Sequence, residues 1–362
     1  MSAVRQAEAV RPAGVTVRGV RVLRGAGGRS VRFRPRTVAV AAGCVVLALV
    51  AAVGAIGSGD FPMSPADVLR TLAGNGGPAE TFVVDQVRLP RVVAALLVGA
   101  ALALAGAVFQ AVVRNPLGSP DILGFTQGAA AGALTVIVVV GGGSLALAGG
   151  AVAGGAATGL VVYALTARHG LQGYRLVLVG IGVAAFLTGV NGYLLTRAKI
   201  QEAQRAVLWL TGSLDGRGWA EALPLLAVLA VLVPVVVLGC GRGLRMLEMG
   251  DDAARALGVR ATRLRVVLLA AAVLLSSVAA ATAGPVAFVA LTAPQLARRL
   301  TRAPGPNLVP SLCLGAAMLV IADLVAQRAV AGHQLPVGVV TGILGGGYLI
   351  WLLATERRAG RI

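Results

Sequence analysis

The sequence has little charge, few aromatic side chains and almost no cysteine. Only 13% of its 362 residues are charged, against about 25% in an average soluble protein, while 57% are hydrophobic and 4% aromatic. The mean hydropathy is +0.86. A core folded in water could not hide so much apolar surface. The composition therefore excludes a cytosolic enzyme, a disordered chain and a secreted disulfide scaffold.

Residue patterns for catalysis and for metal or nucleotide binding are missing as well. The three cysteines, Cys44, Cys240 and Cys313, are odd in number and form no CxxC pair, which argues against a disulfide framework or a zinc site. HExxH, GxSxG and the Lys-Ser/Thr of a phosphate-binding loop do not occur. We therefore predict that the chain is not an enzyme and binds no metal or cofactor itself.

Long apolar runs rich in Ala, Gly, Val and Leu are what the sequence has in quantity. A run of about 20 apolar residues crosses a bilayer as one helix, and small residues let such helices pack closely. We predict an all-α, polytopic membrane protein with about ten transmembrane helices in a domain at 37–354, between a disordered basic arm at 1–36 and a tail at 355–362. The runs are 37–57, 92–113, 122–140, 145–167, 176–196, 220–239, 266–283, 285–300, 308–331 and 337–354.

The charges support one orientation of these ten spans. The chain has 32 basic and 14 acidic residues, a net charge of +18. With the amino terminus inside, 24 basic residues lie on the cytoplasmic side, and 7 basic and 7 acidic residues lie outside. This asymmetry is the positive-inside rule. It predicts cytoplasmic termini in a multi-pass protein of the bacterial cytoplasmic membrane and makes nucleic acid unnecessary as a partner.

Glycine and proline occur at informative positions within and between the apolar runs. Glycine pairs spaced four residues apart are typical of close helix packing, and Pro234 predicts a kink in the sixth span. The pairs are Gly128/Gly132, Gly150/Gly154, Gly155/Gly159 and Gly338/Gly342. The segment 115–124 contains two prolines and two glycines, and 284–299 contains a Gly-Pro entry and a second proline, so we expect a broken helix in both. Such backbone is tolerated at membrane depth where protein or a water-filled path covers it.

Two charged positions precede the second span, in Arg88-Leu89-Pro90-Arg91. They can anchor the helix end at the membrane interface. Alternatively they can dock an acidic external partner, because the planar guanidinium pairs with carboxylates in bidentate fashion.

The connection at 247–259, on the predicted cytoplasmic side, is expected to contain a short helix. Asp251 and Asp252 can cap its start. Ala253, Ala254 and Leu257 would form an apolar stripe, and Gly258 would end the helix. Because the segment is not basic enough for a lipid surface, insertion into a partner protein is the better interpretation.

Asp323 is the one carboxylate well within a run. An intramembrane acid is a candidate ion relay, but an internal pair with Gln327 or Arg328, one turn away, explains it as well. Since the sequence has no nucleotide site and no clear relay, the driving force for any transport must come from a partner.

These segments together resemble the permeases of the ABC importers for ferric siderophores, haem and vitamin B12. The resemblance covers 37–354. It rests on the RLPR entry, on the stretch from Gly99 through Gln110 to Asn115-Pro116-Leu117, on WLTGSL at 209–214, on GDDAARALGV at 250–259 and on LPVGVVT at 335–341.

The resemblance implies roles and partners. Arg88 and Arg91 would meet acidic residues of an extracytoplasmic substrate-binding protein, and Asn115 and Leu117 would line the cytoplasmic constriction. Two permeases, either two copies or a pair of sister subunits, would enclose the pathway, and ATP would act on separate ABC ATPase subunits. The residues that would contact the ATPase are Glu248, Gly250, Asp251, Asp252, Ala253, Arg255, Leu257 and Gly258.

The chain departs from the family pattern at three glutamines. Gln295, Gln327 and Gln334 stand where the family commonly has His, Arg and Glu. Arg328 is adjacent to Gln327 and can replace it as a third docking arginine. These departures resemble the branch with two different permeases for catecholate siderophores of the enterobactin type, the iron entering as a siderophore complex. Hydroxamates, haem and vitamin B12 stay open as cargo, and an ion-coupled secondary transporter using Asp323 is the remaining alternative.

Overall fold

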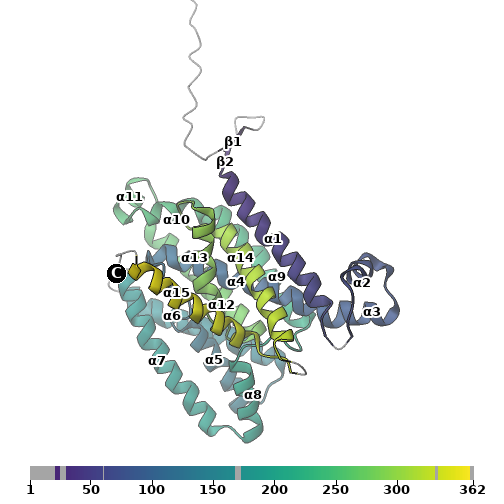
Figure 1. Cartoon of the computed structure of the whole chain (residues 1–362). Helices are drawn as coiled ribbons and strands as arrows, with labels where there is room; N and C mark the ends of the chain where they lie inside the picture. The colour runs from purple at the N-terminus through teal and green to yellow at the C-terminus, as the bar shows by residue number, and fades with distance from the viewer. Residues whose placement is uncertain (1–20, 25–29, 60, 168–172, 331–332, 359–362) are drawn as a thin grey trace, which may run out of the picture.

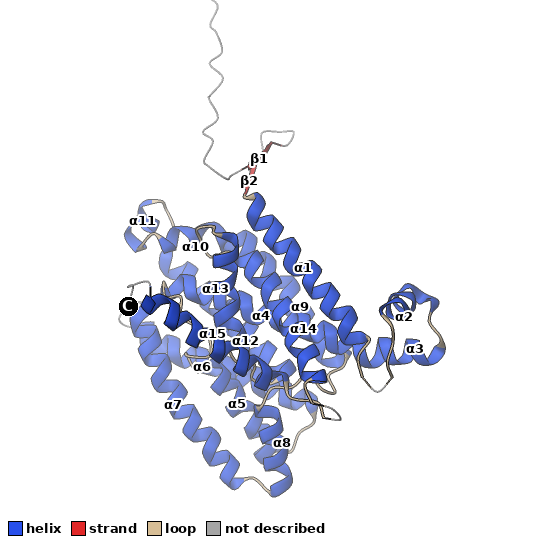
Figure 2. Ribbon diagram, in the orientation of Figure 1, coloured by secondary structure: helices blue, strands red, loops and turns tan. Residues whose placement is uncertain are grey.

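Long apolar helices make up most of the described chain. The structure, a computed structural model, describes residues 21–24, 30–59, 61–167, 173–330 and 333–358. A helix coincides with each of the ten predicted runs (Figures 1 and 2). These are α1 Pro35–Ile56, α4 Leu89–Val113, α5 Phe125–Thr135, α6 Ser144–Ala167, α7 Gly173–Arg197, α9 Trp219–Pro234, α12 Ala261–Ala283, α13 Val289–Thr301, α14 Leu308–Arg328 and α15 Val337–Arg358.

Shorter elements connect them. The short helices are α2 Pro65–Arg70, α3 Pro78–Phe82, α8 Ile200–Leu210, α10 Gly241–Glu248 and α11 Asp251–Ala256. Wider π-helical turns are η1 Thr71–Asn75, η2 Val83–Arg88, η3 Val136–Val140 and η4 Val235–Cys240. η4 follows Pro234 directly, so the predicted kink takes the form of a change in helical hydrogen bonding.

Length and hydropathy single out seven helical stretches of the described chain as able to cross a membrane. They are Pro35–Ile56, Pro78–Val113, Ser144–Ala167, Gly173–Arg197, Trp219–Glu248, Ala261–Ala283 and Leu308–Arg328. The other three predicted spans are shorter as helices. Phe125–Val140 and Val337–Leu352 are short apolar helices, and α13 has 13 residues. The chain is thus a multi-span helical membrane protein.

The two broken segments behave differently. Residues 114–124 leave the helix after α4, as predicted. In the second segment, Gly284 and Phe288 have positive φ angles of 72° and 69°, and the chain is non-helical between α12 and α13. The predicted second break at Pro294 is wrong, since α13 continues through it.

The basic arm is partly structured. The prediction of disorder is wrong for β1 Arg21–Arg24 and β2 Ser30–Phe33, which pair antiparallel, and α1 already begins at Pro35. Both strands contain Val, Leu or Phe, residues that favour strands. The rest of the arm, 1–20 and 25–29, lies outside the described residues, as do 359–362 of the predicted tail; α15 contains 355–358.

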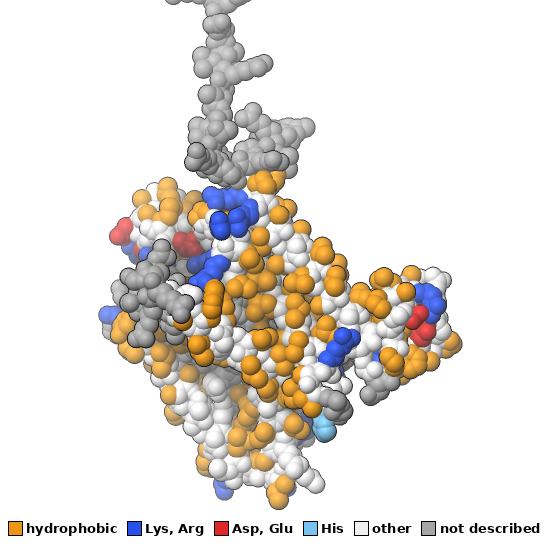
Figure 3. All heavy atoms as spheres, in the orientation of Figure 1, with side chains coloured by type: hydrophobic (Ala, Val, Ile, Leu, Met, Phe, Trp, Pro, Cys, Tyr) orange, Lys and Arg blue, Asp and Glu red, His pale blue; other side chains and the backbone are white. Residues whose placement is uncertain are grey.

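Helix α4 forms the centre of the bundle. It is mostly buried and packs against α12, α13 and α14, whereas α7 and α9 are mostly exposed. Small residues permit this packing: a Cβ atom on Gly106 would lie 1.8 Å from the Ala290 carbonyl oxygen of α13. Exposed apolar side chains cover much of the outer surface (Figure 3), as expected of a protein surrounded by lipid or by apolar partners.

The glycine pairs mostly act as predicted. On α5, Gly128 and Gly132 lie against α6, where a Cβ atom on Gly132 would come 1.9 Å from the Gly150 carbonyl oxygen. Gly342 is the exception, because a Cβ atom there would meet nothing within 4 Å.

Candidate functional site

The candidate residues fall into two groups at opposite ends of the bundle. Figure 1 shows the end of α1, the start of α4 and the end of α14 approaching one another near α2 and α3. Helices α10 and α11 lie at the other end of the bundle, the end at which α1 starts. The first group holds the arginines, and the second holds the predicted constriction and the predicted ATPase contact.

Arg88 and Arg328 both fasten the end of α1. The Arg88 guanidinium donates to the Ile56 carbonyl oxygen at 2.6 Å and to the Phe61 carbonyl oxygen at 2.7 Å. Arg328 donates from Nε to the Ser58 hydroxyl at 2.9 Å. These contacts bring the end of α1, the start of α4 and the end of α14 into one corner. We call it the arginine corner and define it by Arg88, Arg91 and Arg328.

Arg91 points into the protein and its side chain is 13% exposed. Its Nε and Nη2 donate to the two carboxylate oxygens of Asp323 at 3.1 and 3.0 Å. Nη1 donates to the Gln334 side-chain oxygen at 2.7 Å and lies 3.4 Å from Asp215 Oδ1. The Arg91 guanidinium therefore connects α4 with α14, with the loop that contains Asp215 and with the loop that contains Gln334.

Asp323 is 1% exposed and fully partnered. Gln327 donates to its Oδ2 at 2.7 Å, in addition to Arg91. The predicted pair with Gln327 is confirmed, and the pair with Arg328 is not formed. Sequence reasoning missed Arg91 as the counter-ion because the two residues are 232 positions apart.

The predicted constriction lies in the loop between α4 and α5, residues 114–124. Asn115 and Leu117 are both exposed, and the Asn115 side-chain oxygen accepts from the Leu117 amide at 2.9 Å. Gln295 of α13 donates to the Pro116 carbonyl oxygen at 2.6 Å. The glutamine that replaces the family's histidine thus braces this loop, a role that the sequence did not indicate.

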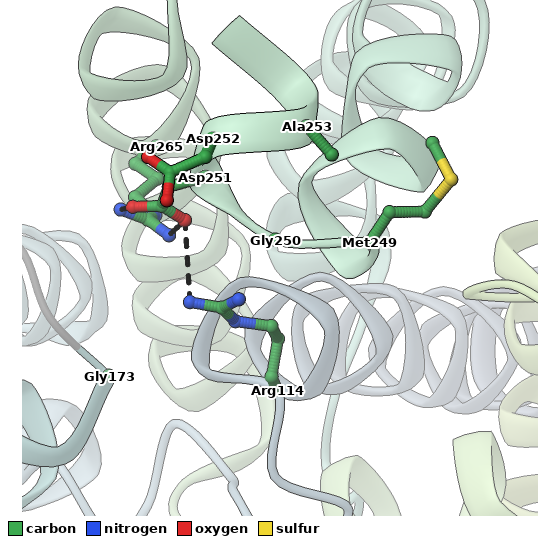
Figure 4. Close-up of a pocket in the computed structure, with 8 residues that line it drawn as sticks. All are labelled: Arg114, Gly173, Met249, Gly250, Asp251, Asp252, Ala253 and Arg265. Carbon is green, nitrogen blue, oxygen red and sulfur yellow. Dashed lines mark hydrogen bonds and ion pairs between the residues drawn. The ribbon is translucent and has the colours of Figure 1, made fainter. Parts of the chain in front are cut away.

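The predicted ATPase contact is residues 248–258, which we call the α11 segment. Gly250, with φ of 112°, precedes α11 and no side chain caps the helix, so the prediction that Asp251 and Asp252 cap it is wrong. Both acids do lie in the first turn, where their charge matches the helix dipole as predicted. Asp251 is bound elsewhere: Arg265 of α12 donates to both its oxygens, at 2.8 and 2.5 Å, and Arg114 lies 3.3 Å away (Figure 4). Hydrogen bonds from Arg265 lower the pKa of Asp251 from its ordinary 3.8.

The outer face of the α11 segment is partly apolar. Ala254 is completely buried, so it cannot belong to the predicted exposed stripe. Leu257 and Met249 are 57% and 62% exposed, and Ala253 is exposed beside them. Asp252 and Arg255 form an exposed ion pair at 3.5 Å, and Glu248 pairs with Arg298 at the same distance. Gly258 follows α11 with φ of 82°. The surface offered outward is therefore apolar with a charged rim.

A cavity of about 520 Å³ lies between the α11 segment and the end of α4 (Figure 4). Arg114, Arg265 and Asp251 line it together with Gly173, Met249, Gly250, Asp252 and Ala253. Within the part of the chain that the structure describes, no group of three or more His, Cys, Asp or Glu side chains could hold a metal ion.

The sequence of this chain is similar to those of known bacterial transport proteins. The model of the FecCD transport family matches residues 45–355. The ferric enterobactin transport system permease protein FepG of Escherichia coli is 43% identical over 310 residues, which cover 86% of this chain and 94% of FepG. The achromobactin transport system permease protein CbrC of Dickeya dadantii is 38% identical over 321 residues, covering 86% and 90%.

A solved structure has the same fold. A chain described as an inward-facing conformation of a putative metal-chelate type ABC transporter superposes with a TM-score of 0.76 at 26% identity. The match covers 88% of this chain and 99% of that one.

Proposed function

This chain belongs to the FecCD transport family, and from that premise we propose that it is the permease subunit of a binding-protein-dependent ABC importer carrying a ferric siderophore into the cytoplasm. The observation that carries the proposal is the similarity to FepG along 94% of that protein. A catecholate of the enterobactin type is the favoured cargo for the same reason, and the iron travels as the siderophore complex.

The proposed partners are inferred from the absence of a nucleotide-binding motif in the sequence. The sequence has no phosphate-binding loop, so ATP is hydrolysed by separate ABC ATPase subunits, which the α11 segment contacts. An apolar patch of Met249, Ala253 and Leu257 with a charged rim suits insertion into a groove of another protein. A second permease, either a sister subunit or another copy, encloses the pathway with this one.

The arginine corner is the proposed docking site for an extracytoplasmic substrate-binding protein. Arg328 is exposed and makes one side-chain hydrogen bond to Ser58, so it can still reach an acidic partner. Arg91 retains only a small exposed area next to Asp215. With this corner outside, the α11 segment and both termini are cytoplasmic, and the membrane is the bacterial cytoplasmic membrane.

The ion-coupled alternative has little support in the geometry around Asp323. A relay must bind and release its ion, whereas Arg91 and Gln327 already occupy both oxygens of this carboxylate. The charge of Asp323 is balanced within the protein, which favours a structural role.

Uptake of radiolabelled cargo tests the proposal. A strain lacking this gene, with and without the gene restored, is supplied with a ferric catecholate, a ferric hydroxamate, haem and cobalamin. We expect restored uptake of the ferric catecholate that stops when ATP is depleted. Uptake of haem or cobalamin alone would replace the cargo, and uptake that persists without ATP would contradict the importer class.

A further inference from the structure

The residue that follows α4 has an unusual backbone conformation. Arg114 follows Val113 with φ of 57° and ψ of 34°, the left-handed conformation that favours glycine. Its amide donates to the Gln110 carbonyl oxygen and closes the helix. The chain turns at this point into the loop that carries Asn115 and Leu117. The side chain of Arg114 therefore leaves the helix end toward the α11 segment (Figure 4).

The acceptor of that side chain is held firmly. Asp251 lies 3.3 Å from Arg114 and also receives two hydrogen bonds from Arg265, whose side chain is only 7% exposed. Because Arg265 belongs to the buried helix α12, Asp251 connects the α11 segment both to that helix and to Arg114. Arg114 itself is 43% exposed and can follow Asp251 when that segment moves.

The loop beyond Arg114 is attached at a second point. Gln295 of α13 binds the Pro116 carbonyl oxygen, two residues along the chain. Residues 114–117 thus extend between the α11 segment on one side and α13 on the other. A displacement of the α11 segment relative to α13 would therefore act on these four residues through the Arg114 side chain.

We propose that Arg114 is a positioning residue that transmits movement of the α11 segment to the loop at 115–117 through its ion pair with Asp251. The inference rests on the proposed function, because it takes the α11 segment as the ATPase contact and the loop as the cytoplasmic constriction. The ion pair is a link between two sites, so its loss weakens their coupling without removing either site.

The test uses the complete importer in proteoliposomes and measures cargo transported per ATP hydrolysed. Arg114→Gln removes the ion pair and leaves the Asp251–Arg265 pair in place. We expect it to lower the ratio by about fivefold, the lower end of typical coupling between sites, with complex assembly unchanged. Arg114→Lys keeps the charge and restores most of the ratio. Arg263→Gln, an exposed arginine two positions before Arg265, is the matched control and transports like the wild type.

Arg114→Gly separates the ion pair from the backbone. Glycine adopts the left-handed conformation readily, so a ratio restored to wild type in this variant would show that the backbone matters and would overturn the proposal. A wild-type ratio in Arg114→Gln would also overturn it.

A second readout does not depend on assembly yield. Labelling of Leu117→Cys in the complete importer should change on addition of ATP, and Arg114→Gln should abolish that change. An unaltered response would contradict the proposal. If the wild-type complex shows no ATP-dependent transport at all, the proposed function fails instead.

Discussion

Arg91 and Asp323 show how a charge predicted for docking can serve the fold. Asp323 is buried, and its removal would leave the mostly buried Arg91 guanidinium with only the exposed carboxylate of Asp215 as a counter-ion, a loss of up to about 3 kcal/mol in comparable buried pairs. We expect Asp323→Ala to lower the thermal unfolding temperature of the purified protein by several degrees, and Gln327→Ala to lower it much less. Equal effects of the two substitutions would contradict this role of Asp323.

Arg328 is the cleaner position at which to test docking. Arg91→Glu would place a second acid beside Asp323 and destabilise the bundle, so a loss of uptake in that variant has two explanations. Arg328 is exposed and contacts Ser58. We expect Arg328→Glu to weaken binding of the substrate-binding protein by about fivefold, the effect of losing an exposed ion pair worth about 1 kcal/mol, and to lower thermal stability less than Arg91→Glu does, because only the hydrogen bond to Ser58 is lost. Binding equal to wild type would remove Arg328 from the docking surface.

The lowered pKa of Asp251 predicts that the stability of the folded protein depends on pH. Because Arg265 lowers its pKa in the folded protein, the pair contributes its full stability above the ordinary value of 3.8, and that stability is lost as pH falls through the lowered pKa. We expect the wild type to lose stability more steeply below pH 3.8 than Asp251→Asn, and the two to run parallel from about pH 5 to 8. Thermal unfolding across this range measures both slopes. Parallel slopes at low pH would contradict the pairing.

The helices illustrate what periodic and compositional signals can and cannot reveal. Ten apolar runs were sufficient to place ten helices, because a membrane span must be apolar along its length. The short connecting helices α2, α3, α8 and α10 were missed. Ser64 and Asp67 form a capping box at the start of α2, which Ser-Pro-Ala-Asp signals in the sequence. The pair of Arg91 with Asp323 carries no local signal, since only the packing of α4 against α14 brings the two together.

Helix α5 depends on glycine for its contact with α6. A Cβ atom on Gly132 would overlap the Gly150 carbonyl oxygen, whereas one on Gly149 would meet nothing within 4 Å. We expect Gly132→Ala to destabilise the protein by about 1–3 kcal/mol, as overpacking does elsewhere. Gly149→Ala is the matched control and should be close to neutral, and thermal unfolding compares them. Equal stability of the two variants would show that α5 and α6 can move apart without cost.

At the scale of the whole molecule, the two proposed contact sites lie at opposite ends of the bundle. The resemblance stated from the sequence identified the class of protein, because the RLPR entry and the GDDAARALGV segment survive in recognisable form. Which contacts those segments make was not predictable. Arg88 binds backbone carbonyls, Ala254 is buried, and Gln295 braces the loop that contains Pro116. Each of these depends on neighbours from distant parts of the sequence.

The energy source of transport distinguishes this account from any ion-coupled mechanism. Proteoliposomes that contain the chain, its second permease subunit and the ATPase are given the loaded substrate-binding protein, and cargo entry is measured with internal or external ATP and with an ionophore. The account predicts uptake that requires ATP on the side of the α11 segment and is unaffected by the ionophore. Uptake driven by an ion gradient in liposomes that hold the permease without the ATPase would contradict it.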